Sequence, residues 1–195
     1  MAFIEQVTDG EATGRAREIL EADRAATGYV QNHVRAFASR PDVLDAWGEL
    51  RKAIAGPMDT RRYEVATVAA ASEIRSSYCS LAHGKILAEQ FMSADAVRAV
   101  AGAGGASLDE ADAAVADLAR KVARDASSVT QADIDRLRDA GLSDPEIFEV
   151  ILAAAMRCFY SKVLDASGVQ PDAALRTLDP ELQEALTVGR QIAPS

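Results

Sequence analysis

Hydrophobic positions along this chain recur with the spacing of helices. Apolar side chains return every three or four residues, as at Leu44, Trp47 and Leu50, which places them on one helix face. Runs in which valine, isoleucine or threonine alternate with polar residues are missing, so strands have little support. Alanine, leucine, glutamate and arginine, which favour helices, are common. The pattern predicts an all-α protein folded as a compact helical bundle.

Capping residues, glycines and prolines indicate where the helices begin and end. Gly28 and Gly168 stand where a glycine closes a helix, and Pro41 can open one. The sequences SLDE at 107–110 and SDPE at 143–146 are typical of a capping box. The expected helices are 11–27, a short one ending before 41, 41–55, 59–74, 76–91, a short one from 93, 107–126, a short one between 130 and 141, 143–168 and 181–188.

One domain accounts for all 195 residues. A chain of this length buries about 70% of the surface that its unfolded form exposes, and no long linker divides it. The glycine-rich stretch AGAGGAS at 101–107 is interpreted as a loop, because no strand precedes it as a phosphate-binding fingerprint requires. We predict a single domain over residues 1–195, with a C-terminal tail at about 173–195.

Composition and charge exclude several classes of partner. The net charge of −9 argues against nucleic acid, because phosphate backbones repel acidic proteins. The apolar run EVILAAAMRCFY at 149–160 contains Arg157 and is shorter than the roughly 20 residues of a membrane-spanning helix. The N-terminal segment lacks the pattern of a secretory signal, and two cysteines make no disulfide framework. We expect a cytoplasmic protein with neither nucleic-acid nor membrane partners.

The scarcest reactive side chains gather in one stretch, ASEIRSSYCSLAHGKIL at 71–87. It holds Tyr78, one of two cysteines (Cys79) and one of two histidines (His83). If a helix begins at the preceding serines, Cys79 lies in its first turn, where the helix dipole favours a thiolate. His83 follows one turn later on the same face, within reach of the thiol proton, which makes an activated nucleophile. Three side chains of the preceding helix could orient the histidine: Glu64, Thr67 and Glu73.

This stretch resembles the alkylhydroperoxidase AhpD-like family, also called the carboxymuconolactone decarboxylase-like family. Members of that family carry a glutamate, eleven intervening residues and then Cys-x-x-Cys-x-x-x-His. Glu64, Cys79 and His83 match this pattern with the same spacing, and Ser76 stands in place of the first cysteine. The match is therefore complete except for one of the two thiols.

Two flanking segments extend the resemblance over residues 28–172. They are GYVQNHVRAFASRPDVLDAWGEL at 28–50 and DIDRLRDAGLSDPEIFEVILAAA at 133–155, and both are similar to the peroxidase-related branch of the family. The resemblance implies an AhpD-like all-α fold that assembles into a homo-oligomer. Aromatic residues make up only 5% of the chain, so apolar helix faces that its own core leaves uncovered would be covered by neighbouring copies.

The resemblance also implies roles for the matching residues. Cys79 would reduce a peroxide and become a sulfenic acid, His83 would be its base, and Glu64 would orient the histidine. Serine cannot form the disulfide, so an external thiol, or Cys158, would have to reduce the sulfenic acid. Ser76 could pass a proton or simply cap its helix.

Other candidate residues have structural interpretations. Tyr78 either lines the pocket or packs in the core, and Trp47 is expected in the core. Cys158, on the long apolar helix, is interpreted as core filler, and the sequence identifies no partner for His33. One cysteine and one histidine fall short of the three or four ligands of a zinc site, so neither a metal nor a cofactor is expected.

Three classes of function remain open from these residues. The first is a thiol-dependent peroxidase, an oxidoreductase that uses Cys79 and an external thiol reductant. The second is a decarboxylase-like lyase that acts on a small organic acid and does not need paired cysteines. The third is a non-catalytic helical oligomer that binds a small ligand. The predicted small-molecule partner is accordingly a peroxide or an organic acid.

Overall fold

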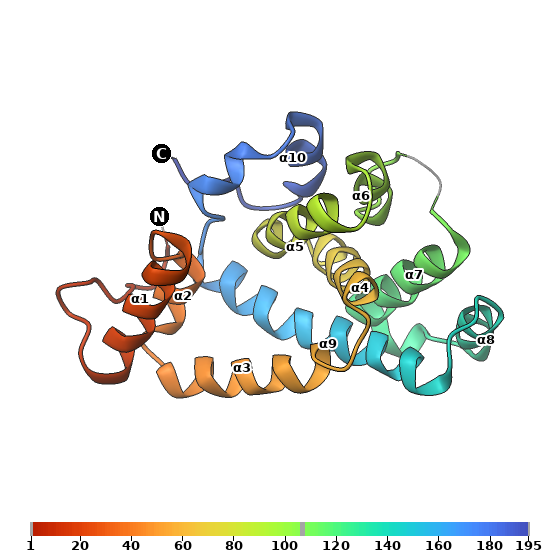
Figure 1. The fold of residues 1–195 in the computed structure, drawn as a ribbon, viewed down its shortest axis with the longest axis horizontal. Helices are drawn as coiled ribbons and strands as arrows, with labels where there is room; N and C mark the ends of the chain where they lie inside the picture. The colour runs from red at the N-terminus through yellow and green to blue at the C-terminus, as the bar shows by residue number, and fades with distance from the viewer. Residues whose placement is uncertain (1, 106–107, 195) are drawn as a thin grey trace.

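Helices make up the regular secondary structure of the computed structural model, which describes residues 2–105 and 108–194 (Figure 1). No strand occurs within these two ranges, and the all-α prediction is confirmed. The α-helices are α1 (Gly14–Thr27), α2 (Asn32–Phe37), α3 (Pro41–Ala55), α4 (Thr60–Glu73), α5 (Ser77–Gln90), α6 (Ala94–Val100), α7 (Glu110–Asp125), α8 (Gln131–Asp139), α9 (Asp144–Ser167) and α10 (Pro180–Leu186). Short 3₁₀-helices span Ala126–Ser128 and Ala173–Thr177.

Local signals in the sequence set most of the helix ends. Gly28 and Gly168 follow α1 and α9 in left-handed conformation, with φ of 87° and 78°. Pro41 is the first residue of α3. At the start of α9, the backbone N–H of Ser143 donates to Glu146 Oε2 at 2.8 Å, which is one half of the predicted capping box.

Two helix starts differ in detail from the predictions. α1 begins at Gly14 rather than near residue 11, because Glu11 belongs to a preceding turn in which its carboxylate accepts from the Thr8 hydroxyl. The predicted capping residue Ser107 lies outside the described residues. The cap of α7 is Asp109, whose side chain accepts a backbone N–H of the first turn.

The central helix of the bundle is α4. It packs against α5, α7 and α9, and Figure 1 shows it among these three helices. Residues 63–72 are all buried, and the small side chains of Ala66 and Ala69–Ala71 let the neighbouring helices approach closely. Glu64 therefore lies where an unpaired carboxylate would be costly.

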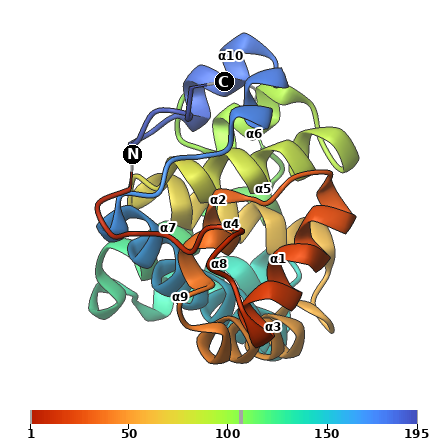
Figure 2. The same cartoon turned by 90° about the vertical axis from the view of Figure 1, so that its left-hand side faces the viewer.

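The N-terminal and C-terminal helices complete the bundle from different sides (Figures 1 and 2). α1 and α2 share a small apolar cluster that includes Leu20 and Val34. The predicted C-terminal helix is confirmed as α10, which packs on α5 and α6. After it, the backbone N–H of Gly189 donates to Ser77 Oγ at 2.7 Å, so the C-terminal segment holds the start of α5. None of the described helices is long and apolar enough to cross a membrane.

Candidate active site

Side chains of α2, α3, α5 and α9 surround a pocket of about 370 Å³, a size suited to a small molecule. Among its lining residues there is no carboxylate. The reactive and aromatic side chains of its walls are His33, Trp47, Arg51, Tyr78, Cys79, His83, Arg157 and Tyr160. Two of the four residues predicted to be catalytic, Cys79 and His83, thus face one cavity.

The turn between α4 and α5 places Cys79 at the pocket. Arg75 in this turn has a positive φ of 60°, a conformation that non-glycine residues seldom adopt. The chain therefore reverses sharply before α5 begins. Ser76 is the N-cap residue, so Cys79 lies in the first helical turn and His83 one turn later, as predicted. Cys79 is only 2% exposed and is reached through the pocket.

Glu64 is the group that orients His83. Its Oε2 lies 2.7 Å from His83 Nδ1, whereas Glu73, a second candidate, pairs with Arg124 at the surface. An ionised carboxylate only accepts, so Nδ1 carries the proton and Nε2 keeps its lone pair. Burial lowers the pKa of His83, and Arg157 lowers it further, against the opposing effect of Glu64. The imidazole is therefore neutral at pH 7 and able to accept a proton.

Arg157 is a site residue that the sequence analysis missed. Its Nη1 donates to Cys79 Sγ at 3.4 Å and its Nη2 to the Tyr63 hydroxyl at 3.3 Å, and the residue is only 3% exposed. Within the described residues no carboxylate lies at ion-pair distance from it. Burial acts to lower the pKa of Arg157, but the neighbouring Cys79 and Tyr63 outweigh it and raise that pKa. The available signal was the only charged side chain in the apolar stretch 150–160.

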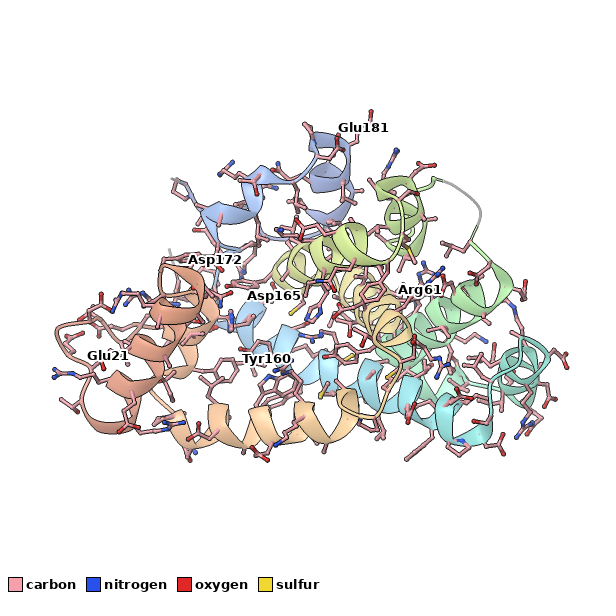
Figure 3. All side chains as sticks on the ribbon, viewed as in Figure 1. Glu21, Arg61, Tyr160, Asp165, Asp172 and Glu181 are labelled. Atoms are coloured by element: carbon pink, nitrogen blue, oxygen red, sulfur yellow. The ribbon has the colours of Figure 1, made fainter. Side chains whose placement is uncertain are left out.

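His33, for which the sequence identified no partner, is part of the opposite wall. Its Nδ1 lies 2.6 Å from the Tyr160 hydroxyl, and burial lowers the pKa of His33 to about 4. Tyr160 is stacked between Phe37 and Trp47, with ring centroids at 4.8 and 4.5 Å. Figure 3 shows Tyr160 above α3. Trp47 is buried as predicted, but it also lines the pocket.

Both structural interpretations of Tyr78 are correct, because its side chain lines the pocket and is also buried in the interior. Its hydroxyl donates to Asp172 and accepts the backbone N–H of His33. Burial raises the pKa of Tyr78 well above its ordinary value, and Asp172 raises it further. Figure 3 shows Asp172 beside α2 and the C-terminal segment. Tyr78 therefore remains protonated and fixes the wall between α2 and α5.

Ser76 and Cys158 lie apart from the pocket. Ser76 is completely buried, does not line the pocket and makes no side-chain cap to its helix. Burial raises the pKa of the nearby Asp165, and the Ser76 hydroxyl partly offsets that rise. Cys158 is half-buried against the main core, and burial raises its pKa. The structure thus brings together Glu64, His83 and Cys79, but it brings neither Ser76 nor Cys158 into the cavity.

The described residues form an all-helical fold in which one thiol and one oriented histidine line the same cavity, whose size suits a small molecule. No protein-family model matches the sequence, and no curated protein matches it. Solved structures do match. A peroxidase-related protein from Ralstonia eutropha JMP134, described as an alkylhydroperoxidase AhpD core, superposes with a TM-score of 0.76 and 21% identity, over 97% of this chain and 98% of that chain.

Two further structures show the same architecture. A peroxidase-related protein from Silicibacter sp. TM1040 gives a TM-score of 0.77 at 20% identity, covering 90% of this chain and 94% of that one. The debrominase Bmp8, in complex with 2,3,4-tribromopyrrole, gives 0.73 at 17% identity, covering 93% and 95%. The chain therefore has the AhpD-like fold.

Proposed function

We propose that this protein is a thiol-dependent, peroxidase-type oxidoreductase in which Cys79 reduces a small hydroperoxide. The observation that carries the proposal is the contact of 3.4 Å between Arg157 Nη1 and Cys79 Sγ. A buried guanidinium without a negative partner is strongly unfavourable. A thiolate on Cys79 supplies that partner, and the thiolate is the reactive form of cysteine.

The remaining residues fit a two-electron reduction. His83 Nε2 takes the thiol proton, and Glu64 stabilises the imidazolium through the bond of 2.7 Å. The thiolate attacks the terminal oxygen of the hydroperoxide, an S–O bond forms and the O–O bond breaks. The departing alkoxide takes the proton from His83. Cysteine is thereby oxidised to sulfenic acid, and the hydroperoxide is reduced to an alcohol.

An external thiol completes the cycle in this proposal. Ser76 cannot form a disulfide, and Cys158 is not among the pocket residues. A small or protein-borne thiol therefore attacks the sulfenic sulfur, releases water and forms a mixed disulfide, which a second thiol reduces. We also propose that the protein assembles into a homo-oligomer, as its resemblance to the family implies.

Trapping of the sulfenic acid tests the proposal. The protein is treated with one equivalent of an alkyl hydroperoxide in the presence of dimedone, and each cysteine is examined by mass spectrometry. We expect the adduct on Cys79, little adduct on Cys158, slower formation in His83→Ala, and peroxide consumption on adding a dithiol. Cys158→Ser, the matched control, should behave like the native chain. Native protein without a Cys79 adduct would rule the peroxidase out and leave the lyase or ligand-binding function.

A second candidate is removal of bromine from a small aromatic ring by the same thiolate. The rings of Trp47, Tyr78 and Tyr160 in the pocket walls favour a planar substrate. The thiolate would take the bromine as a sulfenyl bromide, the ring carbanion would be protonated by His83, and external thiols would release bromide and leave a disulfide. Bromide release from 2,3,4-tribromopyrrole, measured with a thiol present, separates this reaction from peroxide reduction.

A further inference from the structure

We infer that the pocket recognises a substrate with a carboxylate group, and that Arg51 is the residue that binds this group. The inference deepens the proposed function and rests on it for the reacting group. The substrate class is then a small organic hydroperoxide whose far end carries a carboxylate.

The first observation is the charge of the pocket against that of the whole protein. The chain has a net charge of −9, yet the pocket is lined by two arginines and by no aspartate or glutamate. Nearby carboxylates are already engaged, Glu64 by His83, Asp172 by Tyr78 and Asp23 by Gln31. If Arg157 balances the Cys79 thiolate, the positive charge of Arg51 is left over. A pocket of this kind concentrates anions.

The second observation is that Arg51 has no hydrogen-bond or ion-pair partner among the described residues. Most arginines of the described surface form ion pairs, as Arg15 does with Asp45 and Arg136 with Glu110. Arg51 is exposed, lines the pocket, and makes no ion pair or hydrogen bond within residues 2–105 and 108–194. A planar guanidinium suits two-point binding of a carboxylate.

The apolar residues of the same pocket indicate the rest of the substrate. Leu44, Trp47 and Ala82 line the same cavity and offer apolar surface to a hydrocarbon body. Cys79 is buried while Arg51 is exposed. The hydroperoxide group therefore goes in first and meets the thiolate, and the carboxylate stays at the edge near solvent.

Binding of a simple carboxylate tests the site without any reaction. Trp47 is the only tryptophan of the chain and lines the pocket, so its fluorescence reports occupancy. Hexanoate is titrated against hexan-1-ol, which has the same chain length and no charge. We expect hexanoate to bind more tightly than hexan-1-ol, and Arg51→Gln to weaken hexanoate binding about tenfold, the effect of losing one charged hydrogen-bonded contact.

Lys52→Gln is the matched control, since it removes one positive charge from the neighbouring position of α3. Lys52 is exposed and does not line the pocket, so this variant should bind hexanoate like the native chain. Equal binding of hexanoate and hexan-1-ol, or equal losses in the two variants, would overturn the inference.

Rates of Cys79 oxidation distinguish a failure of the Arg51 inference from a failure of the proposed peroxidase function. 6-Hydroperoxyhexanoate and 1-hydroperoxyhexane are compared by dimedone trapping. We expect a higher rate with the carboxylate in native protein, and a ratio near one in Arg51→Gln. Equal rates in native protein would overturn the inference alone. If neither compound oxidises Cys79 while hexanoate binds through Arg51, the peroxidase proposal fails and the anion site stands.

Discussion

Cys79 and Cys158 differ in their contact with Arg157, and we expect their reactivity to run opposite to their exposure. Cys79 is 2% exposed, but Arg157 lies 3.4 Å from its sulfur and a pocket leads to it. Cys158 is more exposed, but burial in apolar surroundings raises its pKa. We expect iodoacetamide near neutral pH to alkylate Cys79 at least several-fold faster than Cys158, as measured by peptide mass spectrometry.

Arg157→Met tests the cause of that difference. It should slow alkylation of Cys79 much more than that of Cys158, whose pKa is set mainly by burial and only to a lesser extent by Arg157, while an unchanged far-UV circular dichroism spectrum shows that the variant is folded. Equal rates for the two cysteines in native protein, or reaction only after denaturation, would show that Cys79 is a structural residue.

His33 links the pocket wall to stability against acid. Its pKa falls from 6.5 in the unfolded chain to about 4 in the folded protein, because burial disfavours the charged ring. A group whose pKa is lowered by folding contributes stability above 6.5, and that contribution is lost as the pH falls towards 4. Between pH 7 and 4.5 the native protein should lose about 2 kcal/mol of unfolding free energy more than His33→Gln. Denaturant titrations at both pH values measure this, and parallel losses would contradict it.

The residues that the sequence identified are those whose partners follow a local spacing. Cys79 and His83 share one helix, and the family pattern supplied Glu64. Arg157 and His33 were not identified as site residues, since their partners lie 78 and 127 positions away. Only the packing of α9 against α5 and α2 brings these groups together. The one local signal was a single charged residue within the apolar stretch 150–160, and such a residue has several structural explanations.

At the scale of elements, the start of α5 carries the main departure from the family pattern. Ser76 is the N-cap and Cys79 lies in the first turn, the spacing of a Cys-x-x-Cys motif. Ser76→Cys should place a second sulfur one turn from Cys79, where a disulfide closes readily. We expect this variant to gain dithiol-dependent peroxidase activity well above that of the native chain, measured in a steady-state peroxide assay.

The double variant Ser76→Cys with Cys79→Ser is the control, and it should be inactive. Mass spectrometry must first show the new disulfide in Ser76→Cys. If the disulfide forms and the rate stays at the native level, the dithiol cycle does not operate in this pocket. The lyase or ligand-binding function would then be favoured.

Helix limits could be predicted better than helix packing. Glycines, prolines and capping side chains act within one turn, so Gly28, Pro41 and Ser143 place their helix ends correctly. No local feature of the sequence indicates that α4 lies at the centre of the bundle. Its burial on all sides follows from three neighbouring helices, and its alanine content is equally typical of an exposed helix.

For the whole molecule, we predict a homo-oligomer, most simply a dimer, trimer or hexamer. Phe148 and Phe159 of α9 are 59% and 49% exposed. They lie eleven positions apart, about three helical turns, and so share one face. Leu50 of α3, which packs against α9, is also 48% exposed. Burying such apolar surface between copies stabilises an assembly by about 25 cal/mol per Å².

Sedimentation at micromolar concentration measures the assembly directly. The native mass should be a multiple of 20.7 kDa, and the double substitution Phe148→Glu with Phe159→Glu should shift it towards the monomer, because two charges would be buried in the contact. Gln131→Glu, at an exposed position of α8, adds a charge elsewhere and should leave the mass unchanged. A native mass near 20.7 kDa would contradict the prediction, and the exposed face of α9 would then have to be explained without a second copy of the chain.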